Sequence, residues 1–138
     1  MHKELRMKIM TLMVGICLFA GYSFNAEAAR TKANNYIYLD ASANPVGQDV
    51  VYCNNVHWVG GNRQSPYVLH VQGGCGELYQ TCTPEGECTE HIDNGIKTTL
   101  TGSPPYTKQE ACALTSQCES QEGDLMDGYG FEMTMVYP

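Results

Sequence analysis

The chain has 138 residues, a length typical of one small domain. Hydrophobic residues make up 43% of it and charged residues 17%, a balance that excludes a long disordered polar chain. The formal net charge of −7 excludes the basic surface of a nucleic-acid-binding protein. Beyond the N-terminal region, no apolar run is long enough to predict a membrane-spanning helix.

The first 28 residues have the three parts of a secretory signal peptide. Lys3, Arg6 and Lys8 supply positive charge, the run Ile9–Ala20 is apolar, and Ala26-Glu27-Ala28 is an A-x-A cleavage signature. An uncleaved membrane anchor is the alternative, but the apolar run is short and polar residues follow it. We therefore expect residues 1–28 to be removed. This leaves a single secreted or periplasmic domain over residues 29–138, with no stable membrane insertion.

Cysteines are the most informative residues of the expected mature domain. Cys17 lies inside the signal peptide, so six of the seven cysteines remain: Cys53, Cys75, Cys82, Cys88, Cys112 and Cys118. An even number in an exported chain indicates three disulfides. A zinc site is the competing interpretation, but zinc favours closely spaced cysteine pairs with histidine partners. Here 5 to 23 residues separate consecutive cysteines, so we predict disulfides and no bound metal or cofactor.

Residues 36–75 have the pattern of an antiparallel β-meander. β-type runs bounded by turn residues occupy four stretches: Tyr36–Leu39, Val50–Cys53, Val56–Val59 and Tyr67–Gln72. Asn54 and Asn55 tolerate positive φ and suit a two-residue turn between the second and third runs. Such a turn would place Val51 opposite Trp58. The only tryptophan of the chain, Trp58, is therefore expected in the core.

The meander suggests one disulfide pairing. Cys53 lies beside the expected hairpin turn, and Cys75 follows the last run after two glycines that let the chain bend. A Cys53–Cys75 bond that closes the meander is therefore the favoured pairing among the fifteen that six cysteines allow.

A series of short motifs runs through the same stretch: Tyr36-Ile37-Tyr38-Leu39-Asp40, Val46-Gly47, Tyr52-Cys53-Asn54, Gly60-Gly61, Tyr67 and Cys75. This series resembles a family of small bacterial secreted proteins of unknown function. Asn55 departs from the family pattern, which has a glycine after the first cysteine. The resemblance implies a fold and an exported location, and it implies no activity.

The second half of the chain predicts a strand, a helix and a further strand. Ile96–Leu100 is a β-type run after a turn, and alternation over residues 131–137 predicts a C-terminal strand. The capping box Thr107-x-x-Glu110 predicts a helix over Lys108–Gln117. The expected fold class is α+β and β-rich. It is a small disulfide-linked domain with an N-terminal antiparallel meander, one short helix and a C-terminal strand.

The predicted helix leaves two disulfide patterns open for the second half. Cys112 and Cys118 would lie about 9 Å apart along a straight helix, whereas a disulfide needs Cα atoms within roughly 7 Å. Either the helix ends before Cys118, or the two cysteines bond outward to Cys82 and Cys88. The outward pattern is favoured, because the capping box makes the first helical turns well defined.

Two groups of side chains carry candidate chemistry. His57 and His70, expected on neighbouring strands, could bind a metal or relay a proton, but half-buried sheet positions are the expected outcome. Glu122, Asp124 and Asp127 lie in a glycine-rich loop, and oxygen-rich loops can hold calcium. Their spacing differs from that of an EF-hand, so a solvated turn is expected. No Gly-x-Ser-x-Gly motif is present, and paired cysteines leave no thiol nucleophile, so we predict no catalytic residue.

An acidic stretch is the remaining candidate site. Glu85, Glu87, Glu90 and Asp93 lie within and just after the Cys82–Cys88 segment, in a mature domain with five basic against thirteen acidic side chains and a net charge of −8. A solvated charged loop is one interpretation, and contact with a basic partner is the other. We predict a non-catalytic binding or interaction protein with an unknown, basic protein partner. The alternatives are a periplasmic immunity or inhibitor protein, a small secreted hydrolase, and a secreted antimicrobial or toxin-like peptide.

Overall fold

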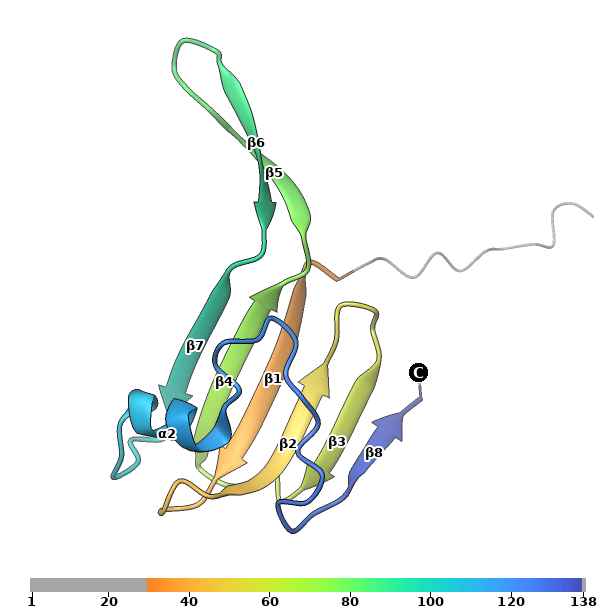
Figure 1. Ribbon diagram of the computed structural model, residues 1–138, viewed down its shortest axis with the longest axis vertical. Coiled ribbons are helices and arrows are strands. Elements are labelled where there is room, and N and C mark those ends of the chain that lie inside the picture. The colour runs from red at the N-terminus through yellow and green to blue at the C-terminus, as the bar shows by residue number, and fades with distance from the viewer. Residues whose placement is uncertain (1–29, 138) are drawn as a thin grey trace, which may run out of the picture.

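The computed structural model describes residues 30–137, which form a six-stranded antiparallel sheet, a separate two-stranded hairpin and one short helix (Figure 1). The predicted signal peptide and its cleavage site lie outside these residues. The main sheet contains β1 (Lys32–Leu39), β2 (Pro45–Val51), β3 (His57–Gly61), β4 (Tyr67–Gly74), β7 (Ile96–Thr101) and β8 (Met133–Val136). The hairpin contains β5 (Glu77–Cys82) and β6 (Cys88–Asp93), and the helix is α2 (Lys108–Thr115). The expected small, disulfide-linked, β-rich fold is confirmed.

The strand order differs from a simple meander. The sheet runs β7-β4-β1-β2-β3-β8, so β4 pairs with β1 and not with β3. The predicted four-strand meander is therefore wrong after β3, and β1 to β4 form a Greek key. The pairing sets Ile37 of β1 opposite Leu69 of β4, and both side chains are fully buried. Burial of these two apolar strands side by side explains why β4 returns to β1. The edge of β3 is occupied by β8 instead.

The β2–β3 hairpin has a longer turn than the sequence suggested. Asn55 has φ of 66°, and its N–H donates to the carbonyl of Tyr52, while Tyr52 N–H donates to the carbonyl of Val56 (2.9 Å). The turn therefore has three residues, with the last one left-handed. This shifts the register by one, so Trp58 lies opposite Val50 and not opposite Val51. Trp58 is only half-buried and lies outside the core cluster, so its predicted core position is wrong.

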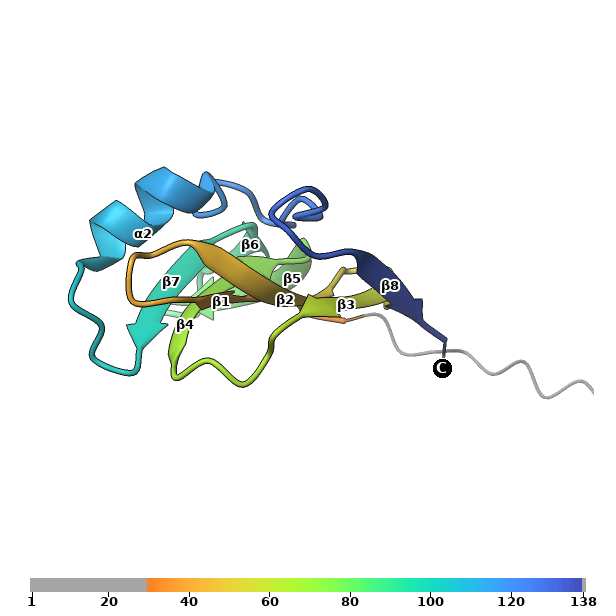
Figure 2. The same ribbon diagram turned by 90° about the horizontal axis from the view of Figure 1, so that it is seen from below.

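One face of the sheet is covered and the other is open. Figure 2 shows α2 and the segment between α2 and β8 on the same side of the sheet. The core lies under this layer and consists of Ile37, Leu39, Leu69, Val71, Ala111 and Met126. Along β1, alternate residues are buried on this face and half-buried on the other, which is the period-2 pattern of a sheet covered on one side.

A buried polar cluster holds the segment after α2 on the sheet. Gln48 Nε2 donates to Asn35 Oδ1 and to the carbonyl of Asp124, both at 2.9 Å. Gln48 Oε1 accepts from the N–H of Met126, also at 2.9 Å. Asn35 Nδ2 in turn donates to Gln117 Oε1 (3.1 Å). In a helix or sheet, backbone groups bond one another. The segment after α2 is irregular, and the side chain of Gln48 bonds its backbone groups instead.

Residues 30–137 contain three disulfides: Cys53–Cys75, Cys82–Cys88 and Cys112–Cys118. The favoured Cys53–Cys75 bond is present and joins the β2–β3 turn to the residue after β4, with Cα atoms 5.5 Å apart. The favoured outward pairing of the other four cysteines is wrong. Each of them bonds within its own short segment, so the hairpin and the helix are closed separately.

The end of α2 explains the Cys112–Cys118 bond. The capping box is present, because Glu110 N–H donates to Thr107 Oγ1 (3.2 Å) and Thr107 N–H donates to Glu110 Oε2 (2.7 Å). The helix stops at Thr115, since Ser116 is left-handed with φ of 56° and its N–H donates to the carbonyl of Cys112. The chain then turns back, which brings the Cα atoms of Cys112 and Cys118 to 5.4 Å. The helix is two residues shorter than the predicted Lys108–Gln117.

Candidate interaction surface

The β5–β6 hairpin projects from the end of the main sheet as a separate arm (Figure 1). Its strands pair over six positions, from Glu77 opposite Asp93 to Cys82 opposite Cys88. At the tip, Thr83 N–H donates to the carbonyl of Glu87 (2.8 Å), and Gly86 takes φ of 91°. This is again a three-residue turn with a left-handed last residue. The Cys82–Cys88 disulfide closes the strands just below it.

The base of the arm is fixed to the main sheet by close backbone contacts. Gly76 N–H donates to the carbonyl of Asp93 (3.0 Å), and Gly74 N–H donates to the carbonyl of Gly95 (2.9 Å). A Cβ at Gly74 would lie 2.2 Å from the carbonyl oxygen of Asp93, so only glycine allows this approach. The Lys32 ammonium also donates to the Asp93 carboxylate. This hydrogen bond, and a second one from Gly95 N–H, lower the pKa of Asp93.

Apolar side chains are exposed on both faces of the arm. Leu78 and Ile92 lie opposite each other and are 66% and 59% exposed. Across the other face, the rings of Tyr79 and His91 stack with centroids 5.2 Å apart, and Tyr79 is 49% exposed. His91 Nε2 also lies 2.8 Å from Thr81 Oγ1. The arm therefore has a defined shape and presents apolar surface to solvent.

The arm is acidic throughout. Five carboxylates, those of Glu77, Glu85, Glu87, Glu90 and Asp93, lie between residues 76 and 95, and the same stretch has no lysine or arginine. Asp93 pairs with Lys32 at the base, whereas Glu85, Glu87 and Glu90 form no ion pair with any residue of 30–137. All four acidic residues singled out from the sequence thus belong to one arm, and three of them carry uncompensated charge toward its tip.

The two histidines singled out from the sequence are not brought together. His57 is on β3 and His70 on β4, and β2 and β1 lie between these strands. Three strand spacings separate them by roughly 14 Å. Their predicted position on neighbouring strands is therefore wrong, and they cannot share a metal or a proton.

Each histidine has its own partners on the open face of the sheet. His70 stacks on Tyr36 with ring centroids 4.1 Å apart and lies 2.9 Å from Asn34 Oδ1. His57 Nε2 lies 2.8 Å from Asp49 Oδ1, and Arg63 donates to the other oxygen of Asp49 (3.2 Å). Burial, and after it the charge of Lys97, lower the pKa of His70.

The acidic residues of the glycine-rich loop take part in hydrogen bonds that hold the loop on the fold. Glu122 Oε1 accepts from the N–H of Cys53 (2.7 Å), and Asp127 Oδ1 accepts from the N–H of Met133 (2.9 Å). Asp124 contributes its backbone carbonyl to Gln48. Residues 30–137 contain no group of three or more His, Cys, Asp or Glu side chains that could hold a metal ion.

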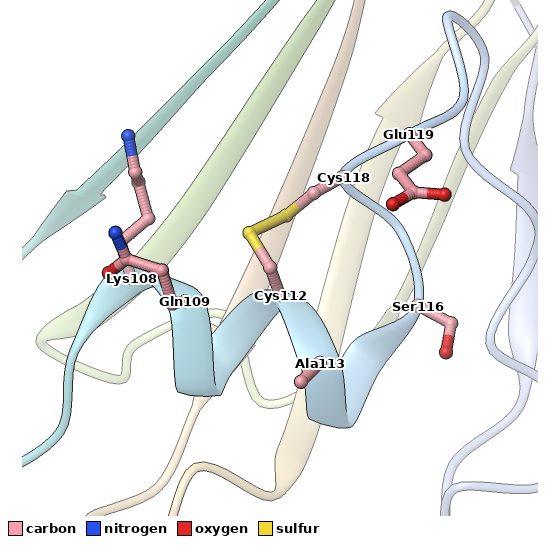
Figure 3. A pocket seen from close by; sticks show the side chains of 7 residues that line it. All are labelled: Lys108, Gln109, Cys112, Ala113, Ser116, Cys118 and Glu119. Atoms are coloured by element: carbon pink, nitrogen blue, oxygen red, sulfur yellow. A yellow bond between two sulfur atoms is a disulfide. The ribbon is translucent and has the colours of Figure 1, made fainter.

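A pocket of about 410 Å³ lies beside the Cys112–Cys118 disulfide (Figure 3). Lys108 and Glu119 contribute its charged groups, and the side chains of Gln109 and Ser116 are also at its wall. Both cysteines are in the disulfide, so neither offers a thiol nucleophile. Apart from the two disulfide cysteines, the pocket contains none of the candidate site residues derived from the sequence.

The chain matches no family model, no curated protein and no solved structure. The resemblance of residues 36–75 to a family of small secreted proteins therefore stays a prediction. The candidate interaction surface is inferred from the geometry of the arm alone.

The acidic residues of this arm were visible in the sequence, but the exposure of Leu78 and Ile92 was not. Two β-type runs flank the Cys82–Cys88 segment, and their alternation is the only sequence signal for a hairpin there.

Proposed function

We propose that the protein is an exported, non-catalytic interaction protein that binds a basic protein partner through the β5–β6 arm. The observation that carries the proposal is the arm itself. It projects from the sheet, with every residue of β5 and most residues of β6 exposed, and it carries the apolar side chains of Leu78, Ile92 and Tyr79. An isolated two-stranded hairpin is marginally stable in water, and this one is held by a disulfide and a fixed base. Such preorganisation lowers the entropy lost on binding.

The apolar residues supply the affinity expected at the centre of a contact. Full burial of a leucine or isoleucine side chain contributes roughly 1.5–3 kcal/mol. More than half of Leu78 and of Ile92 is still exposed, so a partner that covers them gains on the order of 1–2 kcal/mol from each. Contacts of this kind typically form the core of an interface, with a polar rim around them.

The carboxylates define the partner's charge. Contact between two copies of the arm would bring Glu85, Glu87 and Glu90 against the same residues of the other copy, which like-charge repulsion disfavours. A surface rich in lysine or arginine complements them and is attracted over a distance, so binding should weaken as the salt concentration rises.

The proposed location is the cell exterior or the periplasm. Disulfides form and persist in oxidising compartments, and residues 30–137 contain three. The N-terminal signal-peptide pattern and the resemblance to small secreted bacterial proteins support the same location.

An inhibitor or immunity role is the second candidate, and the rigid tip favours it. A disulfide-closed turn that projects from a scaffold can enter the cleft of an enzyme with little loss of conformational freedom. A hydrolase that uses His57, His70 and a carboxylate would need the two histidines close together, and β1 and β2 lie between their strands, so the geometry does not favour this alternative. No contact among the described residues 30–137 favours the antimicrobial or toxin-like alternative.

Capture from the exported fraction of the source cells tests the proposal. The wild type is compared with Leu78→Ser/Ile92→Ser and with Glu85→Gln/Glu87→Gln/Glu90→Gln. Glu119→Gln/Glu132→Gln removes exposed charge elsewhere and is the matched control. We expect a basic protein that the wild type and the control retain and both arm variants lose. The purified pair should then bind more weakly in high salt.

Retention of the same proteins by all four forms would show that the arm is not the binding surface. If the captured protein is an enzyme whose activity falls on binding, the inhibitor role is the correct one.

A further inference from the structure

β8 (Met133–Val136) is one of the two outer strands of the main sheet. It pairs with β3 through four residue pairs, from His57 opposite Val136 to Gly60 opposite Met133. Its other side is the end of the sheet, on the opposite flank from β7 (Figure 1). Among residues 30–137, no strand pairs with the main-chain groups on that side.

The backbone of Met135 points toward this free side. Met133 N–H donates to Asp127 Oδ1 (2.9 Å), so it faces away from β3. Main-chain groups of residues two apart in a strand point the same way, so the N–H and C=O of Met135 and the N–H of Tyr137 face outward as well. The pairing of β3 gives the same result. Val56 bonds Tyr52 and so faces β2, and Trp58, two residues on, faces β2 as well. Its cross-strand partner Met135 therefore faces away from β3. The outer side of β8 therefore presents a short row of unpaired donors and acceptors.

The two outer strands of the sheet differ in their protection. β7 carries Lys97, and the Lys108 ammonium donates to the outward carbonyl of Thr98 (3.4 Å). Lysines on an edge strand oppose pairing with another chain. Residues 133–137 contain no charged side chain of their own, and the Asp127 carboxylate bonds the outer side of β8 only at its first residue, Met133. Val136 and Tyr137 are 39% and 81% exposed. Pro138, the next residue in the sequence, has no N–H, and the Met133 N–H is already bonded to Asp127. The donors available for pairing are therefore the N–H groups of Met135 and Tyr137.

We propose that a second copy of the chain pairs with this edge, β8 against β8. The strands run antiparallel about a two-fold axis at Met135, which exchanges two hydrogen bonds with Met135 of the other copy. Thr134 then lies opposite Val136 of the other copy, and the two sheets join into one of twelve strands. A two-fold contact brings the same segment of both copies together, and the run 133–137, which has no charged side chain, tolerates such a contact in this acidic chain.

The position of the acidic arm fits the same arrangement. The arm connects β4 to β7, on the flank of the sheet away from β8. Pairing at β8 therefore leaves the two arms at the far ends of the joined sheet, where their carboxylates do not repel. The inference does not depend on the arm's partner.

Charge substitutions on the exposed residues of β8 test the contact. The protein is expressed from its full-length gene and purified from the compartment where it accumulates, and sedimentation velocity is measured over a wide concentration range. We expect the wild-type mass to double as concentration rises. Thr134→Glu/Val136→Glu places carboxylates opposite each other in both cross-strand pairs, so dimerisation should need roughly tenfold more protein or more. Thr134→Glu/Val136→Lys is the matched variant, because it places opposite charges there, and it should restore the dimer.

A backbone variant provides a second measurement. Met135→Pro removes an N–H that does not bond β3, so the fold should persist while the dimer is lost. Near-ultraviolet circular dichroism, which reports on Trp58, checks the fold of every variant. Leu78→Ser/Ile92→Ser should leave the dimer intact, which separates this inference from the proposed function of the arm. A wild type that stays monomeric at all concentrations overturns the proposal. A dimer that all the β8 variants retain overturns it as well.

Discussion

Gln48 is a polar residue that the sheet buries completely, and its side chain satisfies three groups on two elements of the fold. The sequence around it, Pro45-Val46-Gly47-Gln48-Asp49, has the composition of a turn, so its burial could not be predicted. Burial of a polar side chain is favourable only where all its partners are in place. That condition depends on Met126 and Asp124, which lie more than 70 residues away.

Replacement of Gln48 by alanine should destabilise the fold strongly. The change leaves the Met126 N–H, the Asp124 carbonyl and Asn35 Oδ1 without their partner in a buried site. We expect the free energy of unfolding to fall by about 2–4 kcal/mol, measured by urea denaturation. Gln64→Ala, at an exposed position, is the control and should change it by less than about 0.5 kcal/mol. Equal effects of the two substitutions would contradict the role of the buried cluster.

His70 should make stability fall as the solution becomes acidic. Its pKa in the folded chain is lowered, chiefly by burial, so the unfolded chain binds the proton more readily. The stability that this group contributes is complete above its ordinary pKa of 6.5 and is lost as pH falls toward the folded pKa. Thermal unfolding at pH 7.5 and pH 5.5 measures this loss. His70→Gln should reduce the difference between the two midpoints, and an unchanged difference would rule out His70 as its source.

At the scale of elements, local patterns were predictable and pairing partners were not. The capping box of α2 and the β-type runs Tyr36–Leu39 and Tyr67–Gln72 depend on neighbouring residues, and all three are present in the fold. The polar first half of β1, from Lys32, was not predicted as strand. The five-residue connection over residues 62–66 is long enough either for a hairpin that pairs β4 with β3 or for a crossover that pairs β4 with β1. Its length therefore did not reveal which strand β4 pairs with. That choice depends on the joint burial of Ile37 and Leu69, a contact between distant segments.

The three disulfides should differ in how much they stabilise the chain. Cys53–Cys75 closes a loop with a sequence separation of 22, against 6 for Cys82–Cys88. In the chain-entropy description, these loops correspond to roughly 3.4 and 2.2 kcal/mol. Cys53→Ser/Cys75→Ser should therefore lower the free energy of unfolding by about 3 kcal/mol. Cys82→Ser/Cys88→Ser should lower it less, because the arm can open without the main sheet. Urea denaturation of the two double variants compares them directly, and a larger loss from the second would contradict this ranking.

At the scale of the whole molecule, acidic and neutral surfaces are separated. The arm carries uncompensated carboxylates beyond the β4–β7 flank, whereas β8 on the other flank is uncharged. Composition predicted the negative charge, and the order of residues located the acidic run. It could not predict that Leu78 and Ile92 would remain uncovered, because alternating β-type runs look the same in a covered strand and in a projecting one.

The exported protein should contain no free thiol. All six cysteines of residues 30–137 are paired, and Cys17 lies in the predicted signal peptide. Alkylation under denaturing, non-reducing conditions should therefore add no mass, and alkylation after reduction should label six sites. Labelling of two or more sites without reduction would contradict the pairing.

The most direct test of the arm's role is site-specific photo-crosslinking in the source cells. A photoreactive side chain is placed at Leu78 or Ile92 on the arm, and at Leu114 or Tyr129 as controls, since all four positions are exposed. We predict that both arm positions crosslink to the same basic protein and that the control positions do not. Crosslinks to a common partner from Leu114 and Tyr129, with none from the arm, would contradict the proposed binding surface.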